Sequence, residues 1–400
     1  MTDTPVAGRS GRDGARSRAV LLAAPLLGLM ALAFFAPILW LLAMSVYDPT
    51  VARGLPATAE ALAGWSGDGN APAAVYPAFA ADLGAAREAG TLLDLARALN
   101  TRLPGIRSRV VSAARANIDP AAADEARFAA LHKSWVDPAT WRAVQASTSP
   151  WTGFHLLAAL DLRVGADGSI ERVPAEQAIF LKVFQRTFLL AAAVTLLTLI
   201  LAFPVAYFAA QAPRPLATLI LALVLLPFWT SMLVRTASWM VLLQKEGAVN
   251  QILALFGLGP LSLMYSTSGL LIAMMHIQLP FTFLPIYSVM KNIPTQQLKA
   301  AYSLGAPPLT AFRRIYLPQA MPGVAAGCLL TFILSLGYYI TPALIGGPQD
   351  QVISNSVANY INAELNWHMA AALSVVLLAF TFVLYAAFGR YLAPSSLKAK

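Results

Sequence analysis

Long runs of apolar residues without a charged side chain recur along the chain. Residues 19–47, 187–213, 215–234, 247–290, 315–349 and 365–389 contain no Asp, Glu, Lys or Arg. A segment that crosses the hydrocarbon core of a bilayer needs about 20 mostly apolar residues, and a helix satisfies its own backbone hydrogen bonds there. We therefore predict six membrane-spanning helices, at residues 19–46, 187–209, 216–240, 266–290, 324–345 and 369–388.

The composition favours a membrane protein over a soluble one. The chain is 58% hydrophobic and only 12% charged, whereas soluble domains are near a quarter charged. A very large soluble core would require amphipathic helices instead of uniformly apolar ones. The first run is too long for a signal-peptide core and no small-residue cleavage site follows it, so it is predicted to remain uncleaved. Residues 249–258 are too short to cross and are predicted to form an interfacial or re-entrant helix.

The distribution of basic residues predicts the orientation of the spans. Basic residues concentrate in the loops that stay in the cytoplasm. With the N-terminus inside, the inner segments hold Arg9, Arg12, Arg16, Arg18, Arg214, Lys291, Lys299, Arg313, Arg314, Arg390, Lys398 and Lys400. The short outer loops hold Lys245 with Glu246, then Asp350 and Glu364. Both termini are therefore predicted to be cytoplasmic, and the net charge of +9 needs no nucleic-acid partner.

The outer segment 47–178 is the one part with a soluble composition, with twelve basic and fourteen acidic residues. Long loops translocate regardless of charge. Leucines at 92, 95 and 99 predict an amphipathic helix near residues 79–103, and a second helix is predicted over 120–133. We expect the tryptophans of the segment to pack in a small core, with partner contact as the alternative: Trp65, Trp135, Trp141 and Trp151.

The inner segment between the fourth and fifth predicted spans is unusual because it lies outside the membrane yet carries regularly spaced apolar residues. It runs from Lys299 to Pro318 with a central glycine, Gly305. We predict two short helices that bend at Gly305, where a glycine is expected to serve either a positive φ or a close backbone contact. The bend is expected to present Ala300, Ala301, Phe312 and Ile315 as an apolar knob framed by Lys299, Arg313 and Arg314. An ordinary amphipathic loop between spans is the alternative.

The spacing in this segment resembles the EAA loop of ABC importer permeases, in which Glu-Ala-Ala is followed by three residues, a glycine and an apolar series ending in Leu-Pro. That resemblance implies coupling helices that sit in a groove of an ATPase subunit. The matching positions are Lys299, Ala300, Ala301, Gly305, Ala306, Phe312, Ile315, Leu317 and Pro318. Lys299 replaces the leading Glu of the family, so a complementary acid is expected on the ATPase.

Further stretches, 186–188, 203–207, 226–230, 234–239, 337–342 and 346–348, look like the spermidine/putrescine group of these permeases. The resemblance covers about residues 180–390. It implies an all-α type I ABC importer fold of the maltose permease kind, with six transmembrane helices and a periplasmic insertion at 47–178. The permease core is then 179–390, with a coupling loop at 291–318 and cytoplasmic ends at 1–18 and 391–400.

The same resemblance implies a bacterial inner-membrane subunit that moves a polyamine or a related amine or opine-like solute. Its implied partners are a second permease subunit, in a heterodimer or a homodimer, a dimer of ATP-binding subunits and a periplasmic solute-binding protein. A membrane-embedded sensor or enzyme with an outer ligand-binding domain is the alternative, and it would not need a cytoplasmic apolar knob.

Several kinds of chemistry have no sequence signal. No glycine-rich G-x-x-x-x-G-K-[ST] loop is present, so no ATP site, cofactor or enzymatic activity is expected in this chain. The single cysteine, Cys328, excludes a disulfide within one chain. The four histidines lack metal-ligand spacing, and His276 is expected to be a hydrogen-bonded residue of the bundle. No acidic residue lies in a span to bind Na⁺ or relay protons.

Polar and aromatic side chains inside the spans are candidates for a translocation path. These are Trp229, Arg235, Trp239, Gln278, Thr331, Ser335, Tyr338, Tyr339 and Thr341. Interfacial anchoring is the alternative for the tryptophans, and helix packing for the small residues. Arg235 is expected to have a structural role near the outer gate, because its charge would repel a polyamine. The glycines at 323 and 327 predict a close approach between two helices.

Overall fold

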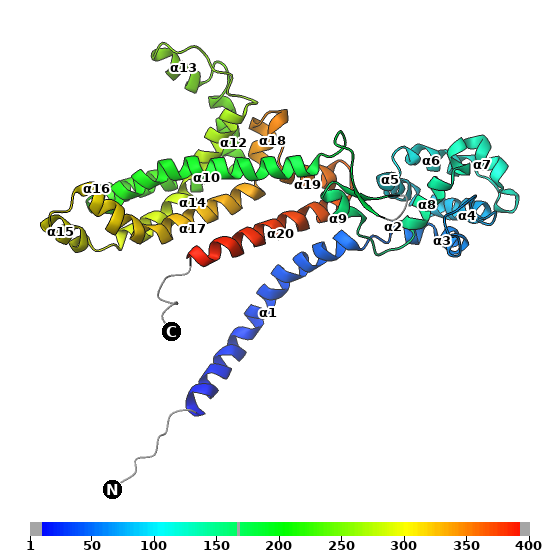
Figure 1. The fold of residues 1–400 in the computed structure, drawn as a ribbon, viewed down its shortest axis with the longest axis horizontal. Helices are drawn as coiled ribbons and strands as arrows, with labels where there is room; N and C mark the ends of the chain where they lie inside the picture. The colour runs from blue at the N-terminus through cyan, green and yellow to red at the C-terminus, as the bar shows by residue number, and fades with distance from the viewer. Residues whose placement is uncertain (1–9, 166–168, 393–400) are drawn as a thin grey trace, which may run out of the picture. The chain divides into compact units, whose positions relative to one another are not determined.

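A computed structural model gives a mostly helical chain (Figure 1). It describes residues 10–165 and 169–392, with backbone alone for 10–21 and 388–392. Parts of both predicted cytoplasmic ends, residues 1–9 and 393–400, lie outside the described residues. The chain divides into two compact units. Unit 1 comprises Met1–Leu156 and Asn366–Ala372, and unit 2 comprises Leu157–Leu365 and Leu373–Lys400.

Unit 1 begins with a long helix, α1 (Ser10–Val46). Its stretch Leu22–Val46 is long and apolar enough to cross a membrane, and none of its most apolar window is buried within the chain. A helix with apolar side chains on all faces is suited to lipid. Short helices follow: α2 (Thr50–Gly54), α3 (Pro56–Leu62), α4 (Val75–Glu88), α5 (Leu92–Arg102), α6 (Ile106–Ala116), η1 (Pro120–Ala122), α7 (Glu125–Leu131), η2 (Lys133–Val136), α8 (Pro138–Ser147) and α9 (Phe154–Ala159), whose last residues belong to unit 2.

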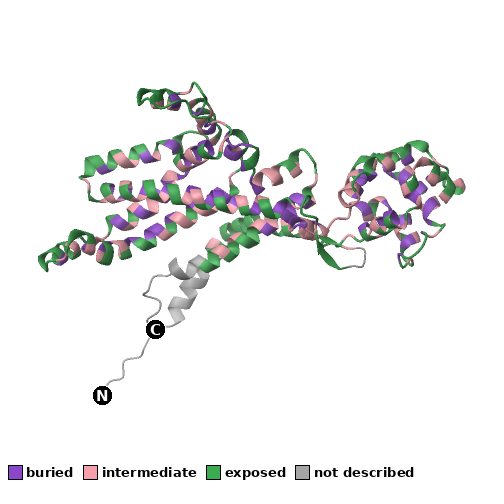
Figure 2. Ribbon diagram, turned by 45° about the horizontal axis from the view of Figure 1, so that its top comes forward, coloured by how far each residue is buried: buried purple, intermediate pink, exposed green. Residues whose placement is uncertain are grey.

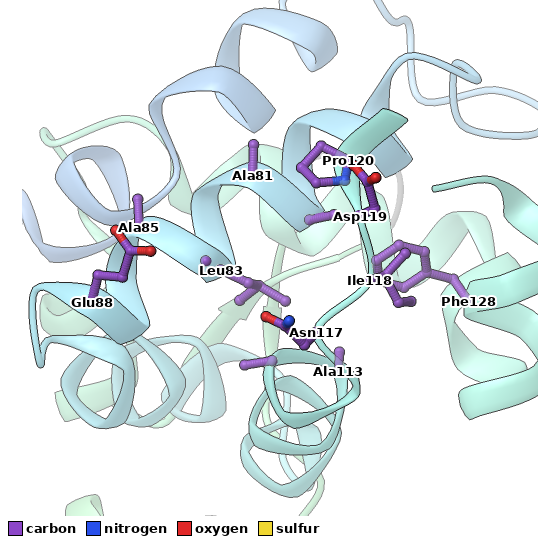
Figure 3. Close-up of a pocket in the computed structure, with 13 residues that line it drawn as sticks. Ala81, Leu83, Ala85, Glu88, Ala113, Asn117, Ile118, Asp119, Pro120 and Phe128 are labelled. Atoms are coloured by element: carbon purple, nitrogen blue, oxygen red, sulfur yellow. The ribbon is translucent and has the colours of Figure 1, made fainter. Parts of the chain in front are cut away.

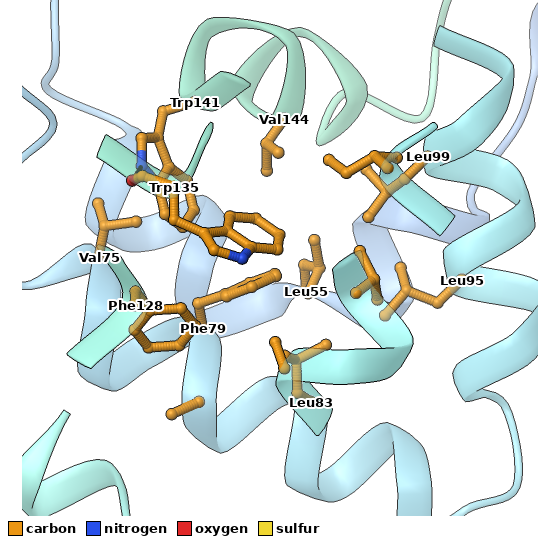
Figure 4. Packing of buried hydrophobic residues seen from close by; sticks show 14 of the residues in the cluster. Leu55, Val75, Phe79, Leu83, Leu95, Leu99, Phe128, Trp135, Trp141 and Val144 are labelled. Carbon is orange, nitrogen blue, oxygen red and sulfur yellow. Dashed lines mark hydrogen bonds between the residues drawn. The ribbon is translucent and has the colours of Figure 1, made fainter. Parts of the chain in front are cut away.

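An aromatic core holds these short helices together (Figure 4). Trp135 and Trp141 are fully buried and both pack on Phe79, with ring centroids 5.0 and 5.3 Å from its ring. The Trp141 indole N–H donates to the Trp135 carbonyl at 2.8 Å, so its polar atom is satisfied inside the core. The prediction of core packing is confirmed for these two tryptophans. Trp151 differs, since 67% of it is exposed.

Two predicted helices of this region have different boundaries in the structure. The helix predicted at 79–103 is two helices, α4 and α5, because Gly90 adopts φ +73° between them and ends α4. Leu95 and Leu99 are buried, as their spacing predicted. The helix predicted at 120–133 is shortened to α7, flanked by η1 and η2. The Asp124 carboxylate accepts from Arg127 N at 2.8 Å and fixes the start of α7.

A buried ionic cluster joins three separated parts of unit 1. Asp48 Oδ2 lies 3.3 Å from His155 Nε2, and Asp48 Oδ1 lies 3.4 Å from His368 Nε2. His368 Nδ1 donates to the Met44 carbonyl at 2.9 Å, since a carbonyl can only accept. Burial lowers the pKa of His155, although Asp48 partly opposes this. Burial alone would raise the pKa of Asp48, but the His155 hydrogen bond and the His368 charge hold it well below its usual value.

Unit 2 starts with a two-stranded antiparallel hairpin, β1 (Leu162–Val164) and β2 (Ile170–Arg172), in which Arg163 pairs with Glu171. The long helix α10 (Phe180–Gln211) follows. Asp161 caps this helix, because its carboxylate accepts from the backbone N–H groups of Phe180 at 3.1 Å and Leu181 at 2.7 Å. A carboxylate at a helix N-terminus satisfies free donors and complements the helix dipole.

Helices α10, α14 (Thr267–Lys291) and α17 (Leu317–Gly337) pack along one another in unit 2 (Figure 1). Buried residues gather where these helices meet (Figure 2). A Cβ added to Gly323 or Gly327 would lie 2.8 Å from the Pro285 carbonyl oxygen or 2.7 Å from that of Thr282. The predicted close approach at the two glycines is therefore confirmed, and the partner helix is α14.

Two predicted spans are wrong in their boundaries. The span predicted at 216–240 is broken into α11 (Arg214–Leu225), η3 (Leu226–Trp229) and α12 (Met232–Leu242). The first part, Arg214–Trp229, is bent by 101° relative to α12. Pro227 interrupts the backbone hydrogen bonds, and Ser231 caps α12 through Val234 N at 3.2 Å. The span predicted at 324–345 begins earlier, as α17, and ends at Gly337 before a separate helix, α18 (Ile340–Ile345).

The remaining elements of unit 2 are short, apart from α20 (Trp367–Leu392), whose first residues belong to unit 1. They are α13 (Ala248–Leu255), α15 (Thr295–Ser303), α16 (Pro308–Ala311), η4 (Phe312–Tyr316), η5 (Pro348–Asp350) and α19 (Ile353–Asn362). Among the described residues, five helices are long and apolar enough to cross a membrane, or six if the bent pair forms one span. The short helix predicted at 249–258 is present as α13.

Candidate functional site

The segment predicted to couple to an ATPase is a helix–turn–helix with a fixed bend. Helix α15 ends in a Schellman motif: Ala306 N donates to the Ala301 carbonyl and Gly305 N to the Tyr302 carbonyl, both at 3.0 Å. Gly305 has φ +84° and no atom within 4 Å of an added Cβ, so the positive φ is the one of the two expected reasons that holds, and this conformation is strained for residues with a Cβ. Pro307 and Pro308 follow and begin α16.

The apolar residues of this segment divide into an inner and an outer set, which corrects the predicted knob. Ala301 is buried, and the half-buried Phe312 ring packs edge-on against Tyr207 with centroids 5.6 Å apart. Phe312 attaches the segment to α10, and neither Phe312 nor Ala301 is presented outward as predicted. Ala300 is exposed, as predicted, and Ile315 is half-buried. The large exposed apolar side chains are Leu304, at 89% exposure, Leu309, at 67%, and Tyr302. Sequence spacing could not identify them, because the side of the bend they occupy depends on packing against α10.

The charges around the exposed apolar tip are all positive. Lys299, Arg313 and Arg314 are exposed, and none of them forms an ion pair with another residue that the structure describes. Gln319 Nε2 donates to Gln297 Oε1 at 2.7 Å and ties α15 to α17. A basic, apolar and internally braced tip is suited to an acidic groove on a partner.

The candidate path residues fall into separate groups within unit 2. Gln278 Nε2 donates to Ser335 Oγ at 2.9 Å between α14 and α17, and both side chains are buried. Thr331 lies in the same contact, hydrogen-bonded to Thr282. Thr341 is bonded to Thr236 at 3.2 Å and joins α18 to α12. These contacts connect helices, and Gln278 Oε1 is the one atom of this group left without a partner among the described residues.

A second group surrounds the break in the third predicted span. Trp239 donates its indole N–H to His276 Nδ1 at 3.1 Å, which gives His276 the hydrogen-bonded role expected for it. Arg235 lies on the same helix as Trp239, and its buried Nε has no partner among the described residues. Trp229 is 78% exposed and Tyr338 is half-buried. The structure therefore does not gather all the path candidates into one site.

Tyr339 lines a cavity of about 630 Å³ that the sequence did not predict. Its walls are formed by Phe180, Gln351, Asn355, Asn359, Tyr360 and Glu364 with smaller residues. Apart from Tyr339, none of these had been a candidate, because they lie in and beside α19, outside the apolar runs that drew attention. No lysine, arginine or histidine lines this cavity.

Unit 1 contains a cavity of about 580 Å³ between α4 and α6 (Figure 3). Leu83, Phe128 and several alanines form its walls, with Glu88, Asn117 and Asp119 among its polar groups. Asp119 already accepts from Ala121 N at 3.0 Å as the cap of η1. No motif in the sequence marks this cavity.

Comparison with known proteins identifies the family. The family model of the binding-protein-dependent transport system inner membrane component matches residues 202–396. The spermidine/putrescine transport system permease protein PotB of Escherichia coli is 33% identical over 202 residues, covering 50% of this chain and 73% of PotB. The E. coli inner membrane ABC transporter permease protein YdcU is 35% identical over 245 residues, covering 56% of this chain and 77% of YdcU.

A third relative is the E. coli spermidine/putrescine transport system permease protein PotC, 33% identical over 106 residues, which cover 26% of this chain and 40% of PotC. The region matched by the family model begins within α10 and contains α14, α17 and the basic tip. Shared ancestry at this level favours transport over a sensor or enzyme. The chain belongs to the family of binding-protein-dependent transport system inner membrane components, the permease subunits of ABC importers.

Proposed function

We propose that this chain forms part of the translocation path for a polyamine or a related small amine or opine-like solute in a bacterial inner-membrane ABC importer of type I fold. A periplasmic binding protein delivers the solute, and a separate ATPase dimer supplies the energy. The polyamine assignment is supported by the names of the relatives PotB and PotC. Family membership supports the type I fold and six spans, with α11 and α12 as one broken span.

Coupling through residues 291–318 is supported by one observation above all. Leu304 and Leu309 are among the most exposed apolar side chains of unit 2, yet the segment that carries them is braced and ordered by a capped turn. Exposed apolar groups on a rigid support are typical of an interface. The matched positions Lys299, Ala300, Ala301, Gly305, Ala306, Phe312, Ile315, Leu317 and Pro318 build this support and its basic rim. An acidic residue of the ATPase is proposed to face Lys299.

A second permease subunit is proposed to complete the path. Trp229, which is 78% exposed, leaves aromatic surface for such a partner. The match to both PotB and PotC favours a heterodimer of related permeases. The other path candidates, Trp239, Ser335, Tyr338, Tyr339 and Thr341, are proposed to line or support the path.

The proposed orientation places 47–178 in the periplasm and both termini in the cytoplasm. It is tested by single cysteines in a Cys328→Ser background, at Ser66 and Ser303, which are both exposed. An impermeant thiol reagent applied to intact spheroplasts should label position 66 and leave position 303 unlabelled until the membrane is opened. The opposite pattern would invert the topology.

Transport is tested in a strain that lacks its own polyamine uptake systems. The complete operon of the importer should restore ATP-dependent uptake of radiolabelled putrescine or spermidine, and deletion of this chain should abolish it. If uptake of a different class of solute is restored, the chain is a permease but the polyamine assignment is wrong. No uptake with any amine, amino acid or opine would reject the proposed substrate range.

A further inference from the structure

The cavity beside α19 has the chemistry of a cation site. Its charged lining group is a carboxylate, Glu364, and no basic residue lines it, although the chain as a whole carries a net charge of +9. Two tyrosine rings, Tyr339 and Tyr360, contribute aromatic faces. Aromatic faces attract cations through their quadrupole, and ammonium groups bind well to such surfaces.

An acceptor atom without a donor also favours a cation in this cavity. Asn355 Oδ1 is buried and has no hydrogen-bond partner among the described residues, while its Nδ2 donates to Gln351 Oε1 at 2.7 Å. The amide of Asn355 is thus fixed by Gln351, with its acceptor left unsatisfied. A buried acceptor without a donor costs free energy, and a bound ammonium group would supply the missing donor.

The end of α19 adds negative potential at the same place. Helix α19 (Ile353–Asn362) ends two residues before Glu364, and its last carbonyls, at residues 360–362, accept no backbone hydrogen bond from the described residues. The C-terminus of a helix carries partial negative charge that favours cations. Burial raises the pKa of Tyr360 and the Glu364 charge raises it further, which places the carboxylate within electrostatic reach of the ring.

We propose that this cavity is a receiving site for a protonated aliphatic amine, with Glu364 pairing with the ammonium group, Asn355 accepting from it, and Tyr360 and Tyr339 packing on its alkyl chain. The volume of about 630 Å³ accommodates a small linear diamine. Residues in and beside α19 lie between the fifth and sixth predicted spans, on the outer side in the proposed orientation. The inference rests on the proposed function, since it assigns the place where the delivered amine first meets the permease.

The test uses the complete importer in proteoliposomes that contain ATP, with the binding protein outside. Glu364→Gln should raise the KM for radiolabelled putrescine about tenfold with little change in kcat, because a charge-assisted contact to the amine is lost. Glu176→Gln removes another exposed carboxylate of unit 2 and should leave KM unchanged. Tyr360→Leu should raise KM, and Tyr360→Phe, which keeps the aromatic face, should restore it. Na⁺ at the same concentration as putrescine should not compete.

The outcomes separate the two proposals. If wild-type importer takes up no amine, the polyamine assignment fails. If the wild type takes up putrescine and Glu364→Gln and Tyr360→Leu both keep its KM, the receiving site is refuted while the proposed function stands. Competition by Na⁺ at the same concentration as putrescine would show that the cavity binds an inorganic cation, and the proposed amine site would be refuted.

Discussion

The bend at Gly305 provides the sharpest test of the coupling segment. Gly305 has φ +84°, and a Cβ added there meets no atom within 4 Å. The substitution Gly305→Val therefore introduces no steric clash, and its whole cost comes from the backbone. A left-handed conformation costs a residue with a Cβ about 1–2 kcal/mol, and more for a β-branched one. Such a change shifts the population of the native turn by a factor of about 5–30.

The expected result is loss of coupling without loss of the membrane bundle. The exposed position of Gly305 keeps it out of the packing between α10, α14 and α17, so membrane insertion and expression of Gly305→Val should match wild type. Recovery of the ATPase with the affinity-purified chain and ATP-dependent uptake should fall together. Gly305→Asn, which tolerates positive φ, should retain most of both.

A matched control separates the bend from the loss of a glycine. Gly259 is exposed, has an ordinary φ, and an added Cβ there also meets no atom within 4 Å, so Gly259→Val should have wild-type uptake. Normal uptake and ATPase recovery by well-inserted Gly305→Val would refute the assignment of this bend to coupling.

Three further predictions concern packing and protonation. Trp135→Ala should lower the stability of unit 1 by about 3–5 kcal/mol, whereas the mostly exposed Trp151→Ala should cost far less, as chemical denaturation followed by fluorescence would reveal. Gly327→Val forces α14 and α17 apart, because its Cβ would lie 2.7 Å from a carbonyl oxygen; a Tm in detergent equal to wild type would contradict that close contact. The pKa of buried His155 is lowered in the folded state, so the unfolded state binds more protons below pH 6.5. Protection of residues 44–50 from hydrogen exchange should therefore fall as the pH drops below 6.5, by at most about tenfold per pH unit. His155→Gln should remove that pH dependence, and its persistence would show that another group titrates.

The sequence predicted well those features that depend on local composition. Apolar runs located the long helices, and the spacing around Gly305 predicted a bend there, because each depends on residues close together in the chain. The paired glycines at 323 and 327 also predicted a close helix approach, since only small residues permit it. The partner helix, α14, came from the structure.

Features that depend on tertiary contacts were missed or misplaced. A hydropathy window averages over Pro227 and Ser231, so it could not show that the third span is broken by 101°. Phe312 was expected to face a partner, but its contact with Tyr207 turns it inward and leaves Leu304 exposed. The cavity beside α19 could not be predicted from the sequence, because its polar residues follow no known motif and come together only through folding.

Contact between the tip formed by residues 299–309 and an ATPase subunit can be tested directly. A single cysteine replacing Leu304, in a Cys328→Ser background, would be cross-linked with a short bifunctional thiol reagent in inside-out membrane vesicles that contain the whole importer. A cysteine at Leu255, which is 84% exposed on α13 and lies on the outer side in the proposed orientation, serves as the control. If the tip contacts the ATPase, the cysteine at position 304 gives a cross-linked product with the ATPase whose yield changes with ATP, and the cysteine at position 255 gives none. Efficient labelling of position 304 with no ATPase product would contradict it.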